Sequence, residues 1–141
     1  MTSLRWLFLN GNALTGTLPS ELGLATLLTG LYCWDTFLTG PLPSEIGLMT
    51  SLTWLHFLNN KLSGPLSSEL GFLTSLNELS LSNNALTGPI PSEMALLTNL
   101  SRFLIAENPE LSGTIPTTLC NTIEFECTKV LCGCDCDCLQ E

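Results

Sequence analysis

The chain has 141 residues, of which 45% are hydrophobic and 12% are charged, and its formal net charge is −9. This length is enough for one domain with a buried core, and the composition is typical of a folded chain. Because only four residues are Lys or Arg, the composition disfavours binding to nucleic acid or to an anionic membrane surface. Gly, Pro, Ser and Asn interrupt every apolar stretch before it reaches the roughly 18 residues of a membrane-spanning helix.

Leucine recurs with a period of 24 residues, and the first leucine of each period opens the pattern LxxLxLxxNxLxGxIPxxLGxLxx. These leucines are Leu4, Leu28, Leu52, Leu76 and Leu100. The fifth copy carries one extra residue in the stretch NPELSG. A fixed period of this length predicts a solenoid, in which each repeat buries its apolar residues against its neighbours.

The first segment of each repeat predicts a β-strand, because its leucines alternate with variable residues. The expected strands lie near residues 6–9, 30–33, 54–57, 78–81 and 102–105. The asparagine after each strand is expected to bond backbone groups of the turn that follows, and Thr36 replaces it in the second repeat. Cys33 replaces an inner leucine, and we expect it to pack in the core as a small apolar residue.

The second segment, LxGxIP, predicts a turn, since Gly permits positive φ and Pro suits a position without a ladder donor. A serine then recurs where its side chain could cap a short helical turn. A glutamate follows each serine and predicts an acidic column, whose simplest interpretation is a solvated edge. The pairs are Ser20 and Glu21, Ser44 and Glu45, Ser68 and Glu69, and Ser92 and Glu93.

The pattern resembles the plant-type leucine-rich repeat, which is also common in algae, from Leu4 to about Asn121. The resemblance implies an α/β fold: a right-handed solenoid with a parallel β-sheet on its concave face and short 3-10 or irregular turns on its convex face. We therefore expect five 24-residue repeats in residues 1–121. No N-terminal cap or secretory signal pattern precedes the first repeat, so we expect a mature piece or fragment with an uncovered N-terminal edge suited to self-association.

Residues 122–141 are predicted to form a cysteine-rich C-terminal cap. The cysteines of the tail are Cys120, Cys127, Cys132, Cys134, Cys136 and Cys138. Disulfides suit a short cap with little core of its own, although six cysteines allow 15 connectivities. The alternative is a cluster of thiolates that binds Zn²⁺ or Cu(I). Disulfides would place the protein outside the cytosol, secreted or at the cell surface, and Asn99 begins an N-glycosylation sequon that agrees weakly with export.

The variable strand positions point away from the core and gather all three tryptophans and the only tyrosine on the concave side. The predicted ligand-binding residues are Trp6, Phe8, Tyr32, Trp34, Asp35, Trp54 and His56. Equal repeat positions stack at strand spacing, so we expect one contiguous patch, and exposed aromatic clusters mark binding sites. The resemblance implies a protein, a peptide or a cell-wall glycan as the partner.

We therefore expect an extracellular binding module that is not an enzyme and needs no cofactor. A spacer of the wall or matrix without a specific ligand is the alternative, since fold alone does not fix function. Ser80, His56 and Asp35 share a face, but their spacing supplies no oxyanion hole and places Asp35 badly. Ice binding is a weaker alternative, based on a ladder of hydroxyl groups at one repeat position. The ladder contains Thr15, Thr39, Ser63, Thr87 and Ser112.

Overall fold

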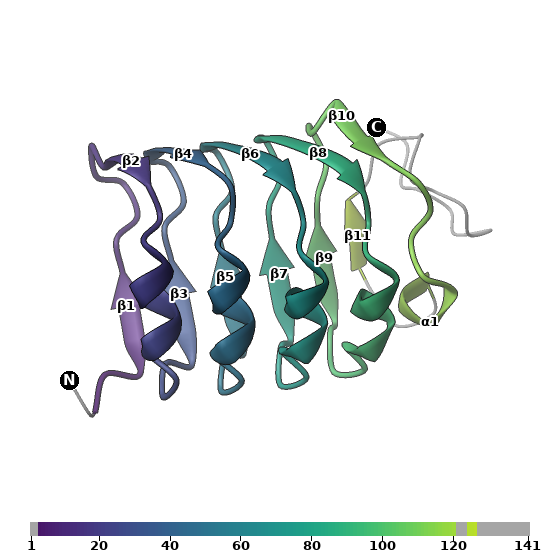
Figure 1. Ribbon diagram of the computed structural model, residues 1–141, viewed down its shortest axis with the longest axis horizontal. Helices are drawn as coiled ribbons and strands as arrows, with labels where there is room; N and C mark the ends of the chain where they lie inside the picture. The colour runs from purple at the N-terminus through teal and green to yellow at the C-terminus, as the bar shows by residue number, and fades with distance from the viewer. Residues whose placement is uncertain (1–2, 121–123, 127–141) are drawn as a thin grey trace.

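The computed structural model describes residues 3–120 and 124–126. Successive repeats wind as a solenoid, and each of the first four contributes a strand to a first sheet, a strand to a second sheet and a short 3-10 turn (Figure 1). This arrangement confirms the predicted leucine-rich-repeat solenoid, with its parallel first sheet on the concave face and 3-10 turns on the convex face. None of the described helices has the length and apolar character that a membrane crossing requires.

The first sheet contains six parallel strands in the order β1-β3-β5-β7-β9-β11. Their bounds are β1 Trp6–Phe8, β3 Gly30–Tyr32, β5 Trp54–His56, β7 Glu78–Ser80, β9 Arg102–Leu104 and β11 Glu124–Glu126. The first five strands pair at equal repeat positions, for example Trp54 with Glu78. The five strands predicted from the sequence are therefore confirmed. Strand β11 extends the sheet into the segment that the sequence predicts as a cap.

The leucines between the variable strand positions form the core. Leu31, Leu55 and Leu79 have no exposed surface, and they belong to one apolar cluster that runs through the repeats. Cys33 is fully buried in the same cluster, which confirms that it packs as a core residue. Burial raises the pKa of the Cys33 thiol to about 12, so the thiol stays protonated and unreactive at neutral pH.

A column of asparagines joins the first sheet to the second. Asn84 donates its side-chain amide to the carbonyls of Phe57 and Leu81, each at 3.0 Å. Its side-chain oxygen accepts the backbone N–H of Leu62, also at 3.0 Å. The same set of bonds recurs one repeat before and one repeat after, so the predicted bonding of the asparagine to backbone groups is confirmed. Its partners, however, lie before it in the chain and in the preceding repeat, and not in the turn that follows it. Thr36 takes this place in the second repeat and donates its hydroxyl to the asparagine of the third.

A second parallel sheet follows the asparagine turns, and the sequence pattern alone does not predict it. Its strands are β2 Thr15–Thr17, β4 Phe37–Gly40, β6 Lys61–Pro65, β8 Ala85–Pro89 and β10 Glu110–Ser112. Figure 1 shows these strands inclined along the solenoid, whereas the first-sheet strands stand across it. The register differs accordingly, because Thr39 pairs with Lys61 and Ser63 pairs with Ala85, 22 positions along the chain and not 24.

Four 3-10 turns cover the convex side. They are η1 Ser20–Leu24, η2 Ser44–Leu48, η3 Ser68–Phe72 and η4 Ser92–Leu96, and the one α-helix of the described residues, α1 Thr117–Cys120, follows them in the row. Glycine permits the close contact between turns. A Cβ added to Gly71 would lie 2.4 Å from the backbone oxygen of Glu93, and Gly23 has the same relation to Glu45.

The prediction that serine caps these turns is wrong. Each serine is the first residue of its turn, and the residue before it, Pro19 in η1, is the N-cap without a side-chain hydrogen bond. The hydroxyl of Ser20 donates instead to the carboxylate of Glu21, at 3.4 Å. The other three turns repeat this bond. The serine oxygen lies one residue too late in the chain to accept the free N–H groups of the turn.

Candidate functional site

Five rings from three neighbouring strands meet on the solvent-facing, concave side of the first sheet. We call this set the aromatic patch, and its members are Trp6, Phe8, Tyr32, Trp54 and His56. The Trp6 ring centroid lies 5.0 Å from that of Trp54 and 6.2 Å from that of Tyr32. The Tyr32 centroid lies 4.7 Å from that of Phe8 and 4.9 Å from that of His56. These separations fall in the range of favourable ring pairs, so the patch is one contiguous cluster.

The patch offers large apolar surface to solvent. Trp6 is 43% exposed and Phe8 is 63% exposed, while Tyr32, Trp54 and His56 are partly buried beside them. The in-register pairing of β1, β3 and β5 brings these variable positions together, as the sequence predicts. A contiguous group of exposed rings can bury a large area against a ligand at a small entropic cost.

Gly30 stands between Trp6 and Trp54 in the register of the sheet. A Cβ at this position would lie 2.5 Å from Cε3 of Trp6 and 2.8 Å from Cε2 of Tyr32. The absence of a side chain therefore lets the two indole rings meet across β3. Sequence reasoning missed Gly30 as a site residue, although it occupies the same repeat position as the two tryptophans.

An ion pair borders the patch on the side of β7 and β9. Glu78 pairs with Trp54 in the sheet, and its Oε1 accepts a hydrogen bond from Nη1 of Arg102 at 2.7 Å. The same oxygen lies 3.3 Å from Nε2 of His56. That nitrogen has no hydrogen-bond partner among the described residues, so it lies close to Glu78 without a hydrogen bond. The sequence predicts Glu78 and Arg102 as outward residues but not as neighbours of a site.

Both titratable rings of the patch are uncharged at neutral pH. Burial lowers the pKa of His56, the Glu78 carboxylate opposes this by raising it, and the Arg102 guanidinium lowers it again. Burial and, to a smaller extent, the Glu78 carboxylate raise the pKa of the Tyr32 phenol. The surface is therefore a set of neutral rings beside one ion pair, which suits apolar and polar contacts together.

Two of the predicted site residues lie outside the stacked cluster. Trp34 follows the end of β3, and among the described rings none pairs with it. Asp35 has a φ of 54° and accepts a hydrogen bond from the Asn59 amide at 2.7 Å. Asn59 in turn accepts one from Asn83 at 2.9 Å. Asp35 therefore stands at one end of a side-chain ladder that follows the turns.

Ser80, His56 and Asp35 do not form a relay. His56 faces the Glu78 carboxylate, and Asp35 bonds to Asn59. Ser80 is 1% exposed, and its hydroxyl has no hydrogen-bond partner among the described residues. The hydroxyl therefore lacks both the base and the access that an activated nucleophile needs.

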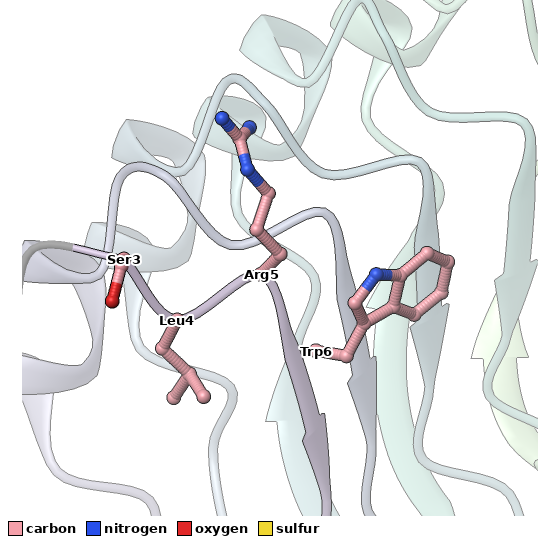
Figure 2. Close-up of a pocket in the computed structure, with 4 residues that line it drawn as sticks. All are labelled: Ser3, Leu4, Arg5 and Trp6. Atoms are coloured by element: carbon pink, nitrogen blue, oxygen red, sulfur yellow. The ribbon is translucent and has the colours of Figure 1, made fainter.

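A hollow of about 510 Å³ lies at the start of the first repeat, lined by Ser3, Leu4, Arg5 and Trp6. Figure 2 shows the side chains of Leu4, Arg5 and Trp6 spreading apart. Specific small-molecule sites instead bring a few polar groups together on one ligand. The aromatic patch is therefore the better candidate for the ligand-binding surface.

The predicted hydroxyl ladder is not aligned across the second sheet, where it falls. The cross-strand partner of Thr39 is Lys61, and that of Thr87 is Glu110. The inclination of these strands shifts equal repeat positions past one another, so charged residues stand opposite hydroxyl groups. The expectation of a ladder at strand spacing is therefore wrong.

The cysteine-rich tail falls almost wholly outside the described residues. Cys120 ends α1, and the other five tail cysteines lie beyond the described part of the chain, together with any disulfide or metal that they bind. Within residues 3–120 and 124–126, no group of three His, Cys, Asp or Glu side chains is arranged to hold a metal ion. The disulfide cap and its metal-binding alternative both remain predictions.

Comparison with known proteins defines the family. The model of the Leucine Rich Repeat family matches residues 3–24 and 75–97. The plant peptide hormone receptor RGFR1 in complex with RGF2 is 32% identical, with a TM-score of 0.82 over 88% of this chain and 20% of the receptor chain. The BIR3–SERK2 complex from Arabidopsis thaliana is 34% identical, with a TM-score of 0.77 over 92% of this chain and 72% of that chain. A plant ice-binding protein is 33% identical, with a TM-score of 0.72 over 85% of this chain and 38% of that chain.

The chain belongs to the leucine-rich-repeat family, of the type found in plant receptor ectodomains. It spans only 14% to 22% of the chains of three larger plant receptors that it resembles. The comparison with curated proteins found no match. The family accounts for the fold, while the ligand must be inferred from the surface.

Proposed function

We propose that this chain is an extracellular binding module that recognises a protein or peptide on its aromatic patch. The observation that carries the proposal is the contiguous set of rings on β1, β3 and β5, of which Trp6 and Phe8 are 43% and 63% exposed. Exposed clusters of this kind are costly in water unless a partner covers them. The neighbouring Glu78–Arg102 pair supplies polar contacts at the border of the patch.

Similar proteins support the partner class. RGFR1 is described in complex with RGF2, GASSHO1/SCHENGEN3 in complex with CASPARIAN STRIP INTEGRITY FACTOR 2, and BIR3 in complex with SERK2. The first two are receptors, and the second is named as the ectodomain of a membrane receptor kinase. We infer a secreted or cell-surface location from the same relatives, and a polypeptide partner in preference to a cell-wall glycan.

The test is selection of ligands from matched peptide and glycan arrays, followed by titration with tryptophan fluorescence as the readout. Replacing Trp54 by Ala should weaken peptide binding by about 2 kcal/mol, roughly 30-fold, because the large indole is a partly exposed member of the cluster, with its centroid 5.0 Å from that of Trp6. The variant should remain folded, since the Trp54 side chain points away from the core.

Phe37→Ala is the matched control, because Phe37 is an aromatic residue with 51% exposure on the second sheet. We expect this variant to bind like the wild type. A ligand whose affinity is insensitive to Trp54→Ala but sensitive to Phe37→Ala would move the site to the second sheet. Selection of glycans alone would replace the peptide by a sugar as the partner, and no ligand on either array would favour the spacer alternative.

A further inference from the structure

The last residue of each 3-10 turn is large, apolar and exposed. We call these residues the apolar ridge: Leu24 is 77% exposed, Leu48 55%, Phe72 55% and Leu96 51%. They occupy equal positions on η1 to η4, and Figure 1 shows these turns side by side along the solenoid. The backbones of successive turns are in close contact at the glycines. The ridge is therefore one column of apolar side chains on the convex side. Scattered single leucines are normal on a protein surface, whereas a continuous column of them is not.

The apolar character is specific to this position of the repeat. Two residues further along the chain, an equally regular exposed position carries threonine in all four repeats. These threonines are Thr26, Thr50, Thr74 and Thr98. Exposure on the convex side is thus compatible with a small polar side chain, and the ridge position differs from its surroundings by carrying Leu or Phe every time.

An acidic column runs beside the ridge. In a 3-10 helix the side chains of residues i and i+3 are eclipsed, so Glu21 and Leu24 lie on the same side of η1. The same relation holds for Glu45 and Leu48 in η2, and again in the two turns that follow. The convex side therefore presents apolar and negative groups in two parallel rows.

We propose that the apolar ridge binds a basic amphipathic α-helix that lies along the solenoid. An α-helix advances about 5.4 Å per turn, close to the roughly 4.8 Å between neighbouring strands of a sheet. In an α-helix that lies along the ridge, each helical turn therefore places one apolar side chain next to one ridge residue. Lys or Arg residues beside its apolar face then meet the glutamate column.

The charge of the chain argues against two other partners for the ridge, a second copy of the chain and an anionic membrane surface. The chain has only four Lys or Arg residues, and none lies on η1 to η4. A second copy placed ridge to ridge would bring two acidic columns together without compensating cations. The same column repels an anionic membrane surface. The site is separate from the aromatic patch and does not depend on the function proposed for it.

The probe is a synthetic Leu/Lys peptide of about 18 residues, or five helical turns, with all leucines on one face. A peptide of the same composition in scrambled order is its control for charge alone. We expect the amphipathic peptide to bind, measured by fluorescence anisotropy, and the variant Leu48→Ser/Phe72→Ser to weaken it at least about tenfold. Glu45→Gln/Glu69→Gln should weaken it more at low salt than at high salt.

Phe37→Ser, which removes an equally exposed ring from the second sheet, and Trp54→Ala, which alters the aromatic patch, should both leave this binding unchanged. Equal affinity for the ordered and scrambled peptides would overturn the proposal, and so would equal affinity of the wild type and Leu48→Ser/Phe72→Ser. Absence of binding at about 1 mM peptide would also overturn it, because a dissociation constant of 1 mM corresponds to a binding free energy of only about 4 kcal/mol. Sedimentation that finds ridge-dependent self-association would assign the ridge to a second copy instead.

Discussion

The two sheets of the solenoid arise from the same 24-residue period but differ in which residues pair between neighbouring strands. In the first sheet, Trp6 pairs with Gly30 and Gly30 with Trp54, so equal repeat positions form straight columns. In the second sheet, Thr39 pairs with Lys61, two positions away from its repeat equivalent. One sheet thus gathers its variable residues into a patch, while the other separates hydroxyl groups that the sequence places at equal positions.

Among the strands, equal repeat positions align into columns in the first sheet, whose strands stand across the solenoid axis, and do not align in the second sheet. The inclined second-sheet strands shift each residue past its repeat equivalent. The asparagine column connects the two arrangements, because each amide bonds carbonyls near the first sheet and a backbone N–H at the start of the second. Breaking that connection is the strongest test of how the sheets depend on each other.

Replacing Asn84 by Ala should have the largest effect. The substitution removes bonds to Phe57, Leu81 and Leu62 and leaves buried backbone groups without partners. We expect the free energy of unfolding to fall by about 3 kcal/mol, measured by urea denaturation followed by circular dichroism. Asn12→Ala is the control, because Asn12 is exposed and donates only to neighbouring turn carbonyls. A loss of similar size in both variants would contradict the coupling of the sheets.

Gly30→Ala should disturb the aromatic patch and leave the sheet in place. The new Cβ meets the rings of Trp6 and Tyr32, and the partly exposed Trp6 ring can move aside. We expect affinity for a selected ligand to fall about tenfold, while the free energy of unfolding changes by less than about 1 kcal/mol. Titration and urea denaturation of the same samples separate the two quantities.

Gly71→Ala gives the contrasting result for a glycine on the convex side. Its Cβ would meet the backbone oxygen of Glu93, which has no room to move, so we expect a loss of stability and unchanged ligand affinity of the folded fraction. If Gly30→Ala lowered stability while keeping full affinity, the preorganised contact between the two indoles would not contribute to binding.

Protonation of His56 should have the smallest effect. Its pKa is lowered in the folded protein from the ordinary 6.5, so the unfolded chain binds the proton more readily. The stabilising contribution of the neutral ring is therefore present above pH 6.5 and is lost as the pH falls from 6.5 through the folded pKa. Urea midpoints at several pH values should fall more steeply for the wild type than for His56→Gln. Parallel curves would show that the ring does not titrate differently in the two states.

The sequence predicts the first sheet well because its signal is local. Alternating leucines identify each strand, and the fixed period identifies its partner, which places Trp6, Tyr32 and Trp54 on one face before any coordinates are known. The second sheet escapes prediction because its strands carry the LxGxIP turn signal, and its register depends on the inclination of the strands. The contribution of Gly30 and the contact between His56 and Glu78 depend on side-chain packing, which the repeat pattern does not encode.

We infer that the first sheet, and not the second, carries the ligand site. The most direct measurement is a two-dimensional NMR titration of the labelled protein with a selected peptide. We expect the indole N–H resonances of Trp6 and Trp54 to shift or broaden first, while the backbone amides of Thr39 and Ser63 stay unchanged. Changes confined to the second-sheet amides, with both indole resonances unaffected at saturation, would contradict this inference.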